Sequence, residues 1–324
     1  MKNKIIIWGF PMVYPLNNTI SYVWNSFYRA FKYLGYEVYW FDDNNFPKDF
    51  DFNDCIFLAE GYDDLNIPIN KSSVYFVHCA YNPKKYVENV KKFIDVRYNL
   101  LEINHPNYIY KLDKEKTTLI DKGCYYEPST DKKIHLKNGK IEYDIQDFDK
   151  IYLSWATNLM PNEIKEEDVY RKRSDTIFFL GTITEDGIYS NKEIIDRFAV
   201  ESIKNGVKFR INNFYNNQLS EEDYIEISKD SLLGFDLRCE AHVKWGHVSC
   251  RLFKNMSYGH LGMTNALEAY KEVDGHCIYN PSPEGLFHDA MAKKDDYSFI
   301  KDGLNYVKEN HTYVNRVKSM MKII

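Results

Sequence analysis

Alternating strand and helix patterns open the chain. Residues 4–8 (KIIIW) form the uninterrupted apolar run that is typical of a buried strand. Residues 21–34 repeat apolar and aromatic side chains at the spacing of an amphipathic helix, and Gly35 is expected to end it. This order predicts a βαβ unit of Rossmann type, although the sequence lacks the GxGxxG fingerprint of dinucleotide sites. The pattern predicts further strands at residues 37–41, 55–59, 74–78 and 151–153.

The rest of the first half has a less regular pattern. Residues 84–93 look helical, and residues 96–101 predict either a strand or a short helix. Residues 134–143 predict a hairpin with Asn138-Gly139 as its two-residue turn. The charged run at residues 163–173 is expected to form a solvated helix that links two domains.

The strand and helix order starts again after the charged run. A strand is predicted at residues 176–180, which Gly181 ends, followed by a helix at 191–205 and a strand at 207–211. Later strands are predicted at residues 232–237, 261–264 and 276–279, and helices at 224–228, from Ser249, at 283–292 and, as one helix or two, at 304–324; residues 266–270 predict a helix or a loop. Two αβ halves of similar size predict two Rossmann-like domains facing each other across a cleft.

Composition narrows the class of protein. The 324 residues carry a formal net charge of −5, which argues against broad nucleic-acid binding but leaves a local basic groove open. The six cysteines form no CxxC pair and are expected to be buried hydrophobic residues in a reducing compartment. The opening apolar run suits a first strand rather than a signal peptide, and no stretch is long enough to span a membrane. We therefore expect a cytoplasmic protein.

Residues 249–265 (SCRLFKNMSYGHLGMTN) carry the strongest chemical signal. Arg251 lies in the first turn of the predicted helix, where free amide groups and the helix dipole favour an anion. The planar guanidinium adds a fork that matches phosphate oxygens. Lys254 lies three residues later on the same face and could add a second positive charge. The segment predicts a site for a nucleoside diphosphate.

The stretch between Arg238 and Arg251 is predicted to be a loop. It carries Glu240, His242, Lys244, Trp245, Gly246 and His247. Two histidines with a glutamate could suggest a metal site, but no HExxH or similar spacing is present. A loop rich in donors before a helix N-terminus favours phosphate or sugar recognition, with an ordinary surface loop as the alternative. The DxD patterns at residues 49–51 and 147–149 follow no convincing apolar strand and are interpreted as chance matches.

Glycine and histidine end several predicted strands. Ligands of open α/β sheets bind beyond the carboxyl ends of the strands, so Gly9 and Gly181 either let a ligand approach the backbone or simply form tight turns. His78 ends the strand VYFVH. It is either a structural residue or a group that contacts a sugar hydroxyl or acts as a base.

The second half resembles the C-terminal domain of GT-B glycosyltransferases, of the type called glycosyl transferases group 1, including its CgeB-like branch. The resemblance covers about residues 176–324. It is carried by these segments in order: FLGT (179–182), Asn191, FRI (209–211), RLFKNMSYG (251–259), GMTN (262–265), IYNPSPEGLFHDAM (278–291) and HTYVNRVKSMMKII (311–324). Residues 155–161 (WATNLMP) also look like the interdomain segment of such proteins.

The resemblance implies a GT-B fold and metal-independent transfer of a sugar from a nucleoside-diphosphate sugar to an acceptor hydroxyl of a glycan or glycoconjugate. It implies an acceptor domain at residues 1–160, a donor domain at 174–305, and a C-terminal helix at 306–324 that crosses back to the first domain. No cofactor is expected. The expected catalytic residues are Arg251, Lys254 and His78. Donor-binding residues are expected to be Gly181, Thr182, Arg238, His247, Ser249, Thr264, Asn265 and Glu268, and acceptor-side residues Gly9, Phe10, Asn18 and Thr19.

The chain departs from the family pattern at the ribose-binding acids. Lys254 stands where the family commonly has the glutamate that holds the donor ribose, and Gly246 stands where the preceding glutamate would be. Ribose recognition is therefore expected to differ. Two alternatives stay open on this evidence: a nucleotide-sugar 2-epimerase, which shares the fold, and a non-catalytic nucleotide-sugar or glycan-binding homologue.

Overall fold

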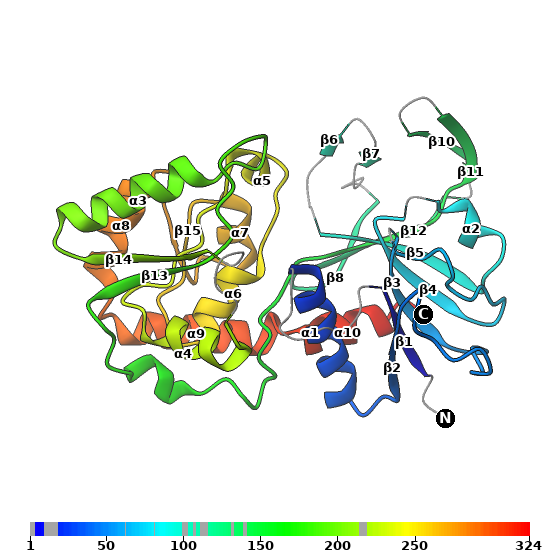
Figure 1. Ribbon diagram of the computed structural model, residues 1–324, viewed down its shortest axis with the longest axis horizontal. Coiled ribbons are helices and arrows are strands. Elements are labelled where there is room, and N and C mark those ends of the chain that lie inside the picture. Colours follow the sequence, from blue (N-terminus) through cyan, green and yellow to red (C-terminus); the bar gives the residue numbers. More distant parts are fainter. Residues whose placement is uncertain are drawn as a thin grey trace. The chain divides into compact units, whose positions relative to one another are not determined.

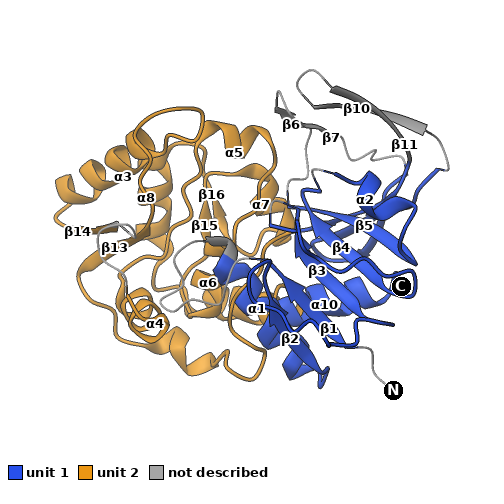
Figure 2. Cartoon of the chain, turned by 45° about the vertical axis from the view of Figure 1, so that its right-hand side comes forward, with its two compact units in different colours: residues 1–153, 313–324 blue, residues 154–312 orange. Residues whose placement is uncertain are grey.

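The chain divides into two compact units. Unit 1 comprises Met1–Leu153 and Tyr313–Ile324, and unit 2 comprises Ser154–Thr312 (Figure 2). The charged run that was expected to link two domains belongs to unit 2, where it forms the 3₁₀ helix η1 (Glu166–Tyr170) and buries Val169 in the core. The computed structural model describes residues 4–9, 19–61, 63–80, 82–98, 103–105, 108–110, 116–130, 133–138, 141–213 and 219–324.

Unit 1 is built on a large, mainly parallel sheet. Within the described residues the sheet has eight strands in the order β2-β1-β3-β4-β5-β12-β9-β8. The two strands at one edge, β9 and β8, run antiparallel to their neighbours, while the other six pair in parallel. The strands are β1 (Ile5–Trp8), β2 (Val38–Phe41), β3 (Ile56–Glu60), β4 (Val74–His78), β5 (Lys92–Arg97), β8 (Thr118–Asp121), β9 (Cys124–Glu127) and β12 (Asp149–Leu153). Apolar runs such as the fully buried β1 are what a parallel sheet needs, because both of its faces are covered.

Two predictions for unit 1 were wrong in detail. The helix predicted at residues 84–93 stops early: α2 covers only Lys84–Val87, and β5 begins at Lys92, because Phe93 and Ile94 are buried in the sheet beside β4. The predicted hairpin is present as β10 (Lys133–Asn138) and β11 (Ile141–Gln146). Its register pairs Asn138 with Ile141, so Asn138, which was predicted to be in the turn, belongs to β10; Gly139 lies outside the described residues. The small strands β6 (Ile103–His105) and β7 (Tyr108–Tyr110) form a separate antiparallel pair.

The C-terminal helix is part of unit 1. Helix α10 (Tyr313–Met321) packs against α1 (Thr19–Tyr33) (Figure 1). The Phe27 and Tyr313 ring centroids lie 4.8 Å apart in an edge-to-face contact. Arg316 of α10 is fully buried and donates a hydrogen bond to the carbonyl of Lys122 at 3.0 Å. The predicted tail thus forms two helices, α9 (Tyr297–Asn310) in unit 2 and α10 in unit 1.

The described part of unit 2 has two short parallel strand pairs. One pair is β13 (Thr176–Gly181) with β14 (Lys208–Asn213), and the other is β15 (Met263–Thr264) with β16 (Ile278–Tyr279). The prediction of a strand at residues 232–237 was wrong. That segment connects the pairs through single hydrogen bonds, from Leu232 N to Thr176 O at 2.8 Å and from Asp236 N to Met263 O at 3.1 Å, and therefore forms no ladder of its own.

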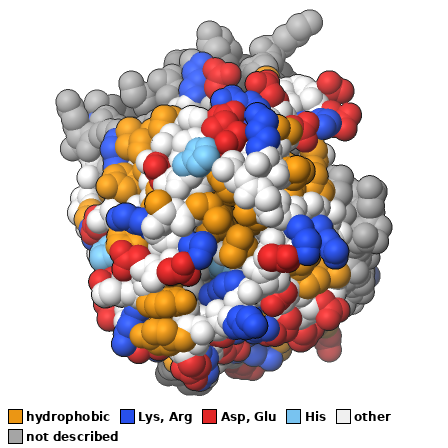
Figure 3. All heavy atoms as spheres, turned by 90° about the vertical axis from the view of Figure 1, so that its left-hand side faces the viewer, with side chains coloured by type: hydrophobic (Ala, Val, Ile, Leu, Met, Phe, Trp, Pro, Cys, Tyr) orange, Lys and Arg blue, Asp and Glu red, His pale blue; other side chains and the backbone are white. Residues whose placement is uncertain are grey.

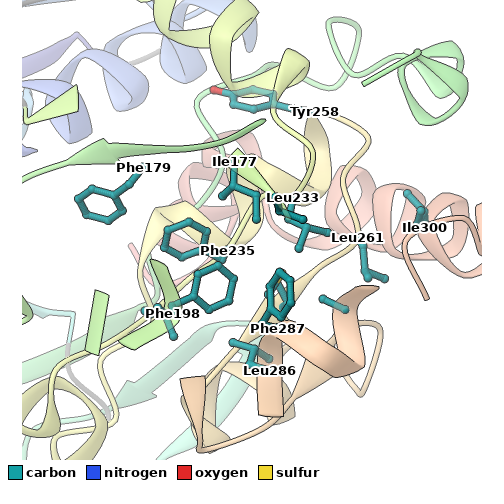
Figure 4. Close-up of a cluster of buried hydrophobic side chains, with 14 of the residues drawn as sticks. Ile177, Phe179, Phe198, Leu233, Phe235, Tyr258, Leu261, Leu286, Phe287 and Ile300 are labelled. Carbon is teal, nitrogen blue, oxygen red and sulfur yellow. The ribbon is translucent and has the colours of Figure 1, made fainter. Parts of the chain in front are cut away.

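Helices surround these strands and share one aromatic core. Phe198 and Phe235 stack with centroids 4.6 Å apart, Phe235 stacks on Phe179 at 5.7 Å, and Phe287 meets Phe198 edge-on (Figure 4). Phe179 is therefore held in place by the core behind it. The helices of unit 2 are α3 (Lys192–Lys204), α4 (Glu221–Asp230), α5 (Glu240–Lys244), α6 (Cys250–Ser257), α7 (Leu267–Glu272), α8 (Pro283–Lys293) and α9. Helix α5 occupies part of the stretch that was predicted to be a loop.

No helix within the described ranges has both the length and the apolar character that a membrane span requires.

Candidate functional site in unit 2

Helix α6 begins where its sequence predicts. Ser249 is the N-cap, with an extended backbone, and its Oγ accepts a hydrogen bond from the amide of Arg251 at 3.2 Å. Leu252, Phe253 and Met256 are fully buried and pack the helix into a hydrophobic cluster of unit 2. Gly259 follows the helix with a φ of +80°, and a side chain there would collide with the backbone of Asp168. The position of Arg251 in the first turn is therefore fixed by the cap, the core and the glycine stop.

Arg251 is a cation that has no ion-pair partner among the described residues. Its guanidinium carbon lies 4.9 Å from the centroid of the Phe179 ring, and the residue is half-buried. Throughout the part of the chain that the structure describes, no acceptor comes within hydrogen-bond or ion-pair distance of this guanidinium. Burial and the charge of nearby Arg238 lower the pKa of Arg251, which means that its surroundings disfavour the charged form. A bound anion would remove that cost.

Gly181 makes room for the guanidinium. It is the last residue of β13, two residues after Phe179, and a Cβ at this position would collide with the Arg251 guanidinium. The absence of a side chain is therefore what allows Arg251 to lie across the end of the strand. Thr182 follows, and its carbonyl accepts a hydrogen bond from Asn191 Nδ2 at 3.0 Å. Asn191 Oδ1 also accepts from Thr184 N at 2.8 Å, so Asn191 closes the loop that leads to α3.

Three of the predicted donor-binding residues meet at Asp236, and a fourth, Asn265, holds one of them. This fully buried carboxylate pairs with Arg238, accepts from Ser249 Oγ at 3.0 Å through Oδ1, and accepts from Thr264 Oγ1 at 3.1 Å through Oδ2. Asn265 holds the backbone of Arg238 on both sides, accepting from its amide at 2.7 Å and donating to its carbonyl at 2.9 Å. These polar groups are thus committed to one another, and the network positions α6 and its neighbouring loops.

Asp236 was not among the site residues predicted from the sequence. Burial opposes its ionisation, but the charges of Arg238 and Arg251 and the hydrogen bonds of Arg238 and Ser249 hold its pKa below the ordinary value. It is therefore an anion at neutral pH. The signal that could have revealed it is a single acid inside the apolar run LLGFDL, because a buried charge needs a fixed partner.

Lys254 points to a different neighbour from Arg251. It is almost fully buried, and its Nζ lies 4.0 Å from the centroid of the Tyr224 ring of α4. The segment at residues 155–161 also packs against α6, because Thr157 Oγ1 lies 2.7 Å from Ser257 Oγ and Tyr258 Oη donates to Asn158 Oδ1 at 2.8 Å. Lys254 thus lies on a side of α6 that packs against other parts of unit 2.

Aromatic and histidine rings gather beside the Asp236 network. His247 is buried between Trp155, at 5.1 Å between centroids, and His242, at 4.9 Å. Burial and the charge of Arg238 lower the pKa of His242 to about 4, so its ring is neutral at physiological pH. Tyr189 extends the cluster to solvent. Its ring centroid lies 5.4 Å from that of His242, and 45% of the surface of Tyr189 is exposed.

Among the described residues, no contact joins Glu268 to the Asp236 network. It lies on α7 and pairs with Lys271 of the same helix at 2.8 Å. Within the described residues there is also no group of three or more histidine, cysteine or acidic side chains placed to hold a metal ion.

The predicted acceptor-side residues lie in unit 1. Gly9 follows β1 with a φ of +123°, and a Cβ there would come within 3.1 Å of Glu60 Cβ. His78 ends β4, and its Nδ1 lies 2.8 Å from Glu60 Oε2. Although burial favours the neutral ring, interactions with Cys79 and Glu60 raise the pKa of His78 to about 10. Thr19 is the first residue of α1, and Phe10 and Asn18 lie outside the described residues.

A hollow on another face of unit 2 has different chemistry. It lies between α3 and α8, which run side by side, and encloses about 620 Å³. Its three basic side chains all pair with carboxylates: Lys192 with Asp196 at 2.5 Å, Arg197 with Glu284 at 2.8 Å, and Lys204 with Glu201 at 3.8 Å. Figure 3 shows acidic and basic side chains interspersed over the face of the molecule that it draws. Among the described residues, the hollow therefore offers no unpaired cation comparable to Arg251.

Comparisons with known proteins identify the fold. A solved structure described as "alpha-glucosyltransferase in complex with UDP and a 13-mer DNA containing a central A:G mismatch" aligns with 100% of this chain and 99% of its own, at a TM-score of 0.55 and 8% sequence identity. No model of a known protein family matches the sequence, and no curated protein matches it. At this identity the likeness establishes the fold alone. The chain has the α/β fold of a GT-B glycosyltransferase, as the resemblance implied.

Proposed function

We propose that this chain is a glycosyltransferase that moves a sugar from a nucleoside-diphosphate sugar to an acceptor hydroxyl, without a metal ion. The observation that carries the proposal is the Arg251 guanidinium, which is half-buried over Phe179 and has no acceptor among the described residues. A diphosphate supplies the oxygens that this fork lacks. The fold shared with a glucosyltransferase whose structure contains UDP supports the same assignment.

The charge of the leaving group explains why an arginine belongs at this position. When the bond between the sugar and the β-phosphate breaks, negative charge grows on the phosphate oxygen. The Arg251 guanidinium and the amide groups at the start of α6 would stabilise that charge, and the Phe179 ring and the Asp236 network fix their positions beforehand. Arg238, Ser249, Thr264 and Asn265 would then act mainly by positioning. Gly181 and Thr182 would border the phosphates.

Lys254 and His78 have weaker support as catalytic residues. Lys254 would add positive potential near the diphosphate, but its Nζ lies against Tyr224. The raised pKa of His78 makes its ring an imidazolium at neutral pH, so we expect it to donate a hydrogen bond to a sugar or acceptor oxygen rather than to accept a proton. We propose that the acceptor is a glycan or glycoconjugate that binds to unit 1.

A screen of nucleotide sugars tests the proposal. Thermal unfolding is followed with UDP-, GDP-, ADP- and CMP-sugars, starting with UDP-glucose because the structural neighbour contains UDP. A ligand at about 100 times its Kd stabilises the folded state by about 2.7 kcal/mol, which is a readily measured rise in Tm. If none of these nucleotides raises the Tm, the proposed donor site is wrong.

Turnover then separates an enzyme from a binding module. The nucleotide sugar that binds is incubated with the protein, and release of the nucleoside diphosphate is measured without acceptor, with oligosaccharides, and with duplex DNA. A transferase is expected to release the diphosphate faster when its acceptor is present. Binding without release in any of these mixtures would favour the non-catalytic alternative, which the replacement of both ribose-binding glutamates makes a specific possibility.

A further inference from the structure

A cysteine occupies a sharp turn at the end of a central strand of unit 1. Cys79 follows β4 with a φ of +51°, in the left-handed region that residues other than glycine rarely adopt. The end of β3 lies close to this turn, because a Cβ on Gly61 would come within 2.6 Å of the Cys79 carbonyl oxygen. Cys79 is half-buried and lies at the carboxyl edge of the sheet.

Two cationic groups approach this sulfur. Cys79 Sγ lies 3.1 Å from His78 Nε2 and 3.6 Å from Arg97 Nη1. The other ring nitrogen of His78 lies 2.8 Å from Glu60 Oε2, and the raised pKa of His78, about 10, makes both ring nitrogens donors. An imidazolium and a guanidinium beside a sulfur stabilise negative charge on it.

The remaining groups around the cluster come from β5 and the residue that follows it. Asp95 is fully buried and pairs with Arg97, and the centroid of the Tyr98 ring lies 4.4 Å from that of the His78 ring.

Glu60, the last residue of β3, is also buried, and its second oxygen, Oε1, has no hydrogen-bond partner among the described residues. A buried carboxylate oxygen without a donor is costly, so a molecule that donates a hydrogen bond to this oxygen would remove that cost.

Other cysteines of the chain lack this arrangement. Cys239 also contacts a histidine, with its Sγ 3.2 Å from His242 Nδ1, but Cys239 is buried and the lowered pKa of His242 keeps that ring neutral. Burial raises the pKa of the Cys55 thiol to about 11. Cys250 is half-buried as Cys79 is, yet no interaction given for the described residues joins it to a histidine ring. These residues provide internal controls.

We propose that Cys79, held by His78, Glu60 and Arg97, is a nucleophilic thiol and a site of covalent modification by hydroperoxides. Its sulfur attacks one peroxide oxygen, an S–O bond forms, and the O–O bond breaks. The leaving oxygen departs with the electron pair and takes a proton from the His78 imidazolium, as water or an alcohol. The sulfur is oxidised by two electrons to a sulfenic acid, and the peroxide is reduced by two. This proposal does not depend on the donor site in unit 2.

The test compares cysteines within one intact protein. The full chain is treated at pH 6.5 with limiting iodoacetamide or, separately, with hydrogen peroxide followed by a sulfenic-acid trap, and modification of each cysteine peptide is followed by mass spectrometry. Cys79 is expected to react at least tenfold faster than Cys250, and Cys239 and Cys55 are expected to react more slowly still. A Cys79 rate equal to or below that of Cys250 would overturn the proposal without any variant.

Two variants test the positioning role of the neighbours. His78→Gln removes the cation next to the sulfur, and Glu60→Gln removes the carboxylate that holds it. Each is expected to slow Cys79 alkylation about tenfold at pH 6.5 and to leave the Cys250 rate unchanged, which also reports that unit 2 stays folded. Unchanged Cys79 alkylation in both variants would show that His78 and Glu60 do not activate the thiol.

Discussion

The guanidinium of Arg251 stacks on the ring of Phe179, with 4.9 Å between the guanidinium carbon and the ring centroid. The ring belongs to the aromatic core of unit 2, where it stacks on Phe235, so the cation rests on a rigid support. Such a surface orients the planar fork and leaves its donors for a ligand. The contact joins the end of β13 to the first turn of α6, and the proposed donor site depends on it.

Replacement of Gly181 by alanine tests how this contact is accommodated. The added Cβ would collide with the Arg251 guanidinium, so the side chain must leave its place over Phe179. We expect the affinity for the nucleotide identified by the screen to fall about tenfold, which corresponds to about 1.4 kcal/mol, as measured by titration calorimetry.

A double-mutant cycle shows whether Gly181→Ala acts through Arg251. If it does, the glycine substitution should cause no further loss of affinity in an Arg251→Gln background. Independent losses that add up in the double variant would mean that Gly181 affects the ligand by another route.

Removal of Asp236 should destabilise unit 2. Asp236→Ala leaves the half-buried Arg238 without its counter-ion and the buried Ser249 and Thr264 without their acceptor. Loss of one partner of a buried pair costs about 3–5 kcal/mol, measured as the change in the free energy of unfolding in urea. The control is Asp175→Ala, which breaks an exposed, solvent-screened pair with Lys208 and is expected to change the free energy of unfolding far less than Asp236→Ala does. Equal effects of the two substitutions would contradict the network assigned to Asp236.

The pKa of His78 predicts how stability depends on pH. Because the folded-state pKa, about 10, lies above the ordinary value of 6.5, the stabilisation is fully present below pH 6.5. It is lost progressively as the pH rises towards 10. Urea midpoints measured at pH 6.5, 8 and 9.5 should therefore fall more steeply for the wild type than for His78→Gln. Parallel curves for the two proteins would show that His78 is not held as an imidazolium.

The strands of unit 1 could be predicted because parallel strands buried on both faces leave continuous apolar runs in the sequence. Both ends of α6 could also be predicted, since Ser249 caps the N-terminus of the helix and Gly259 follows its C-terminus. The prediction of a helix at residues 84–93 was wrong in part because the apolar pattern of the whole segment suits a helix. Only pairing with β4 makes Lys92 and Phe93 part of a strand, and that pairing is a tertiary contact that no local pattern records.

The candidate site was only partly visible in the sequence for the same reason. Helix-terminus chemistry singled out Arg251, which is a local property. Its support by Phe179 and the grouping of Arg238, Ser249 and Thr264 around Asp236 arise from contacts between distant segments. Residue types near a helix N-terminus suggested ligand contacts, while the structure gives several of these side chains hydrogen bonds with one another. Asp236 was missed because an acid within an apolar run has meaning only once its partners are known.

The most direct test of the central claim is calorimetric titration of UDP into three proteins: the wild type, Arg251→Gln, and Arg197→Gln as the matched control. Arg197 is an exposed arginine of the same unit that already pairs with Glu284. Loss of a charge-assisted hydrogen bond costs about 1.5–3 kcal/mol, so we predict that Arg251→Gln weakens binding about 10- to 100-fold while Arg197→Gln leaves it unchanged. Equal affinity of UDP for the wild type and Arg251→Gln would contradict the assignment of Arg251 to the donor diphosphate.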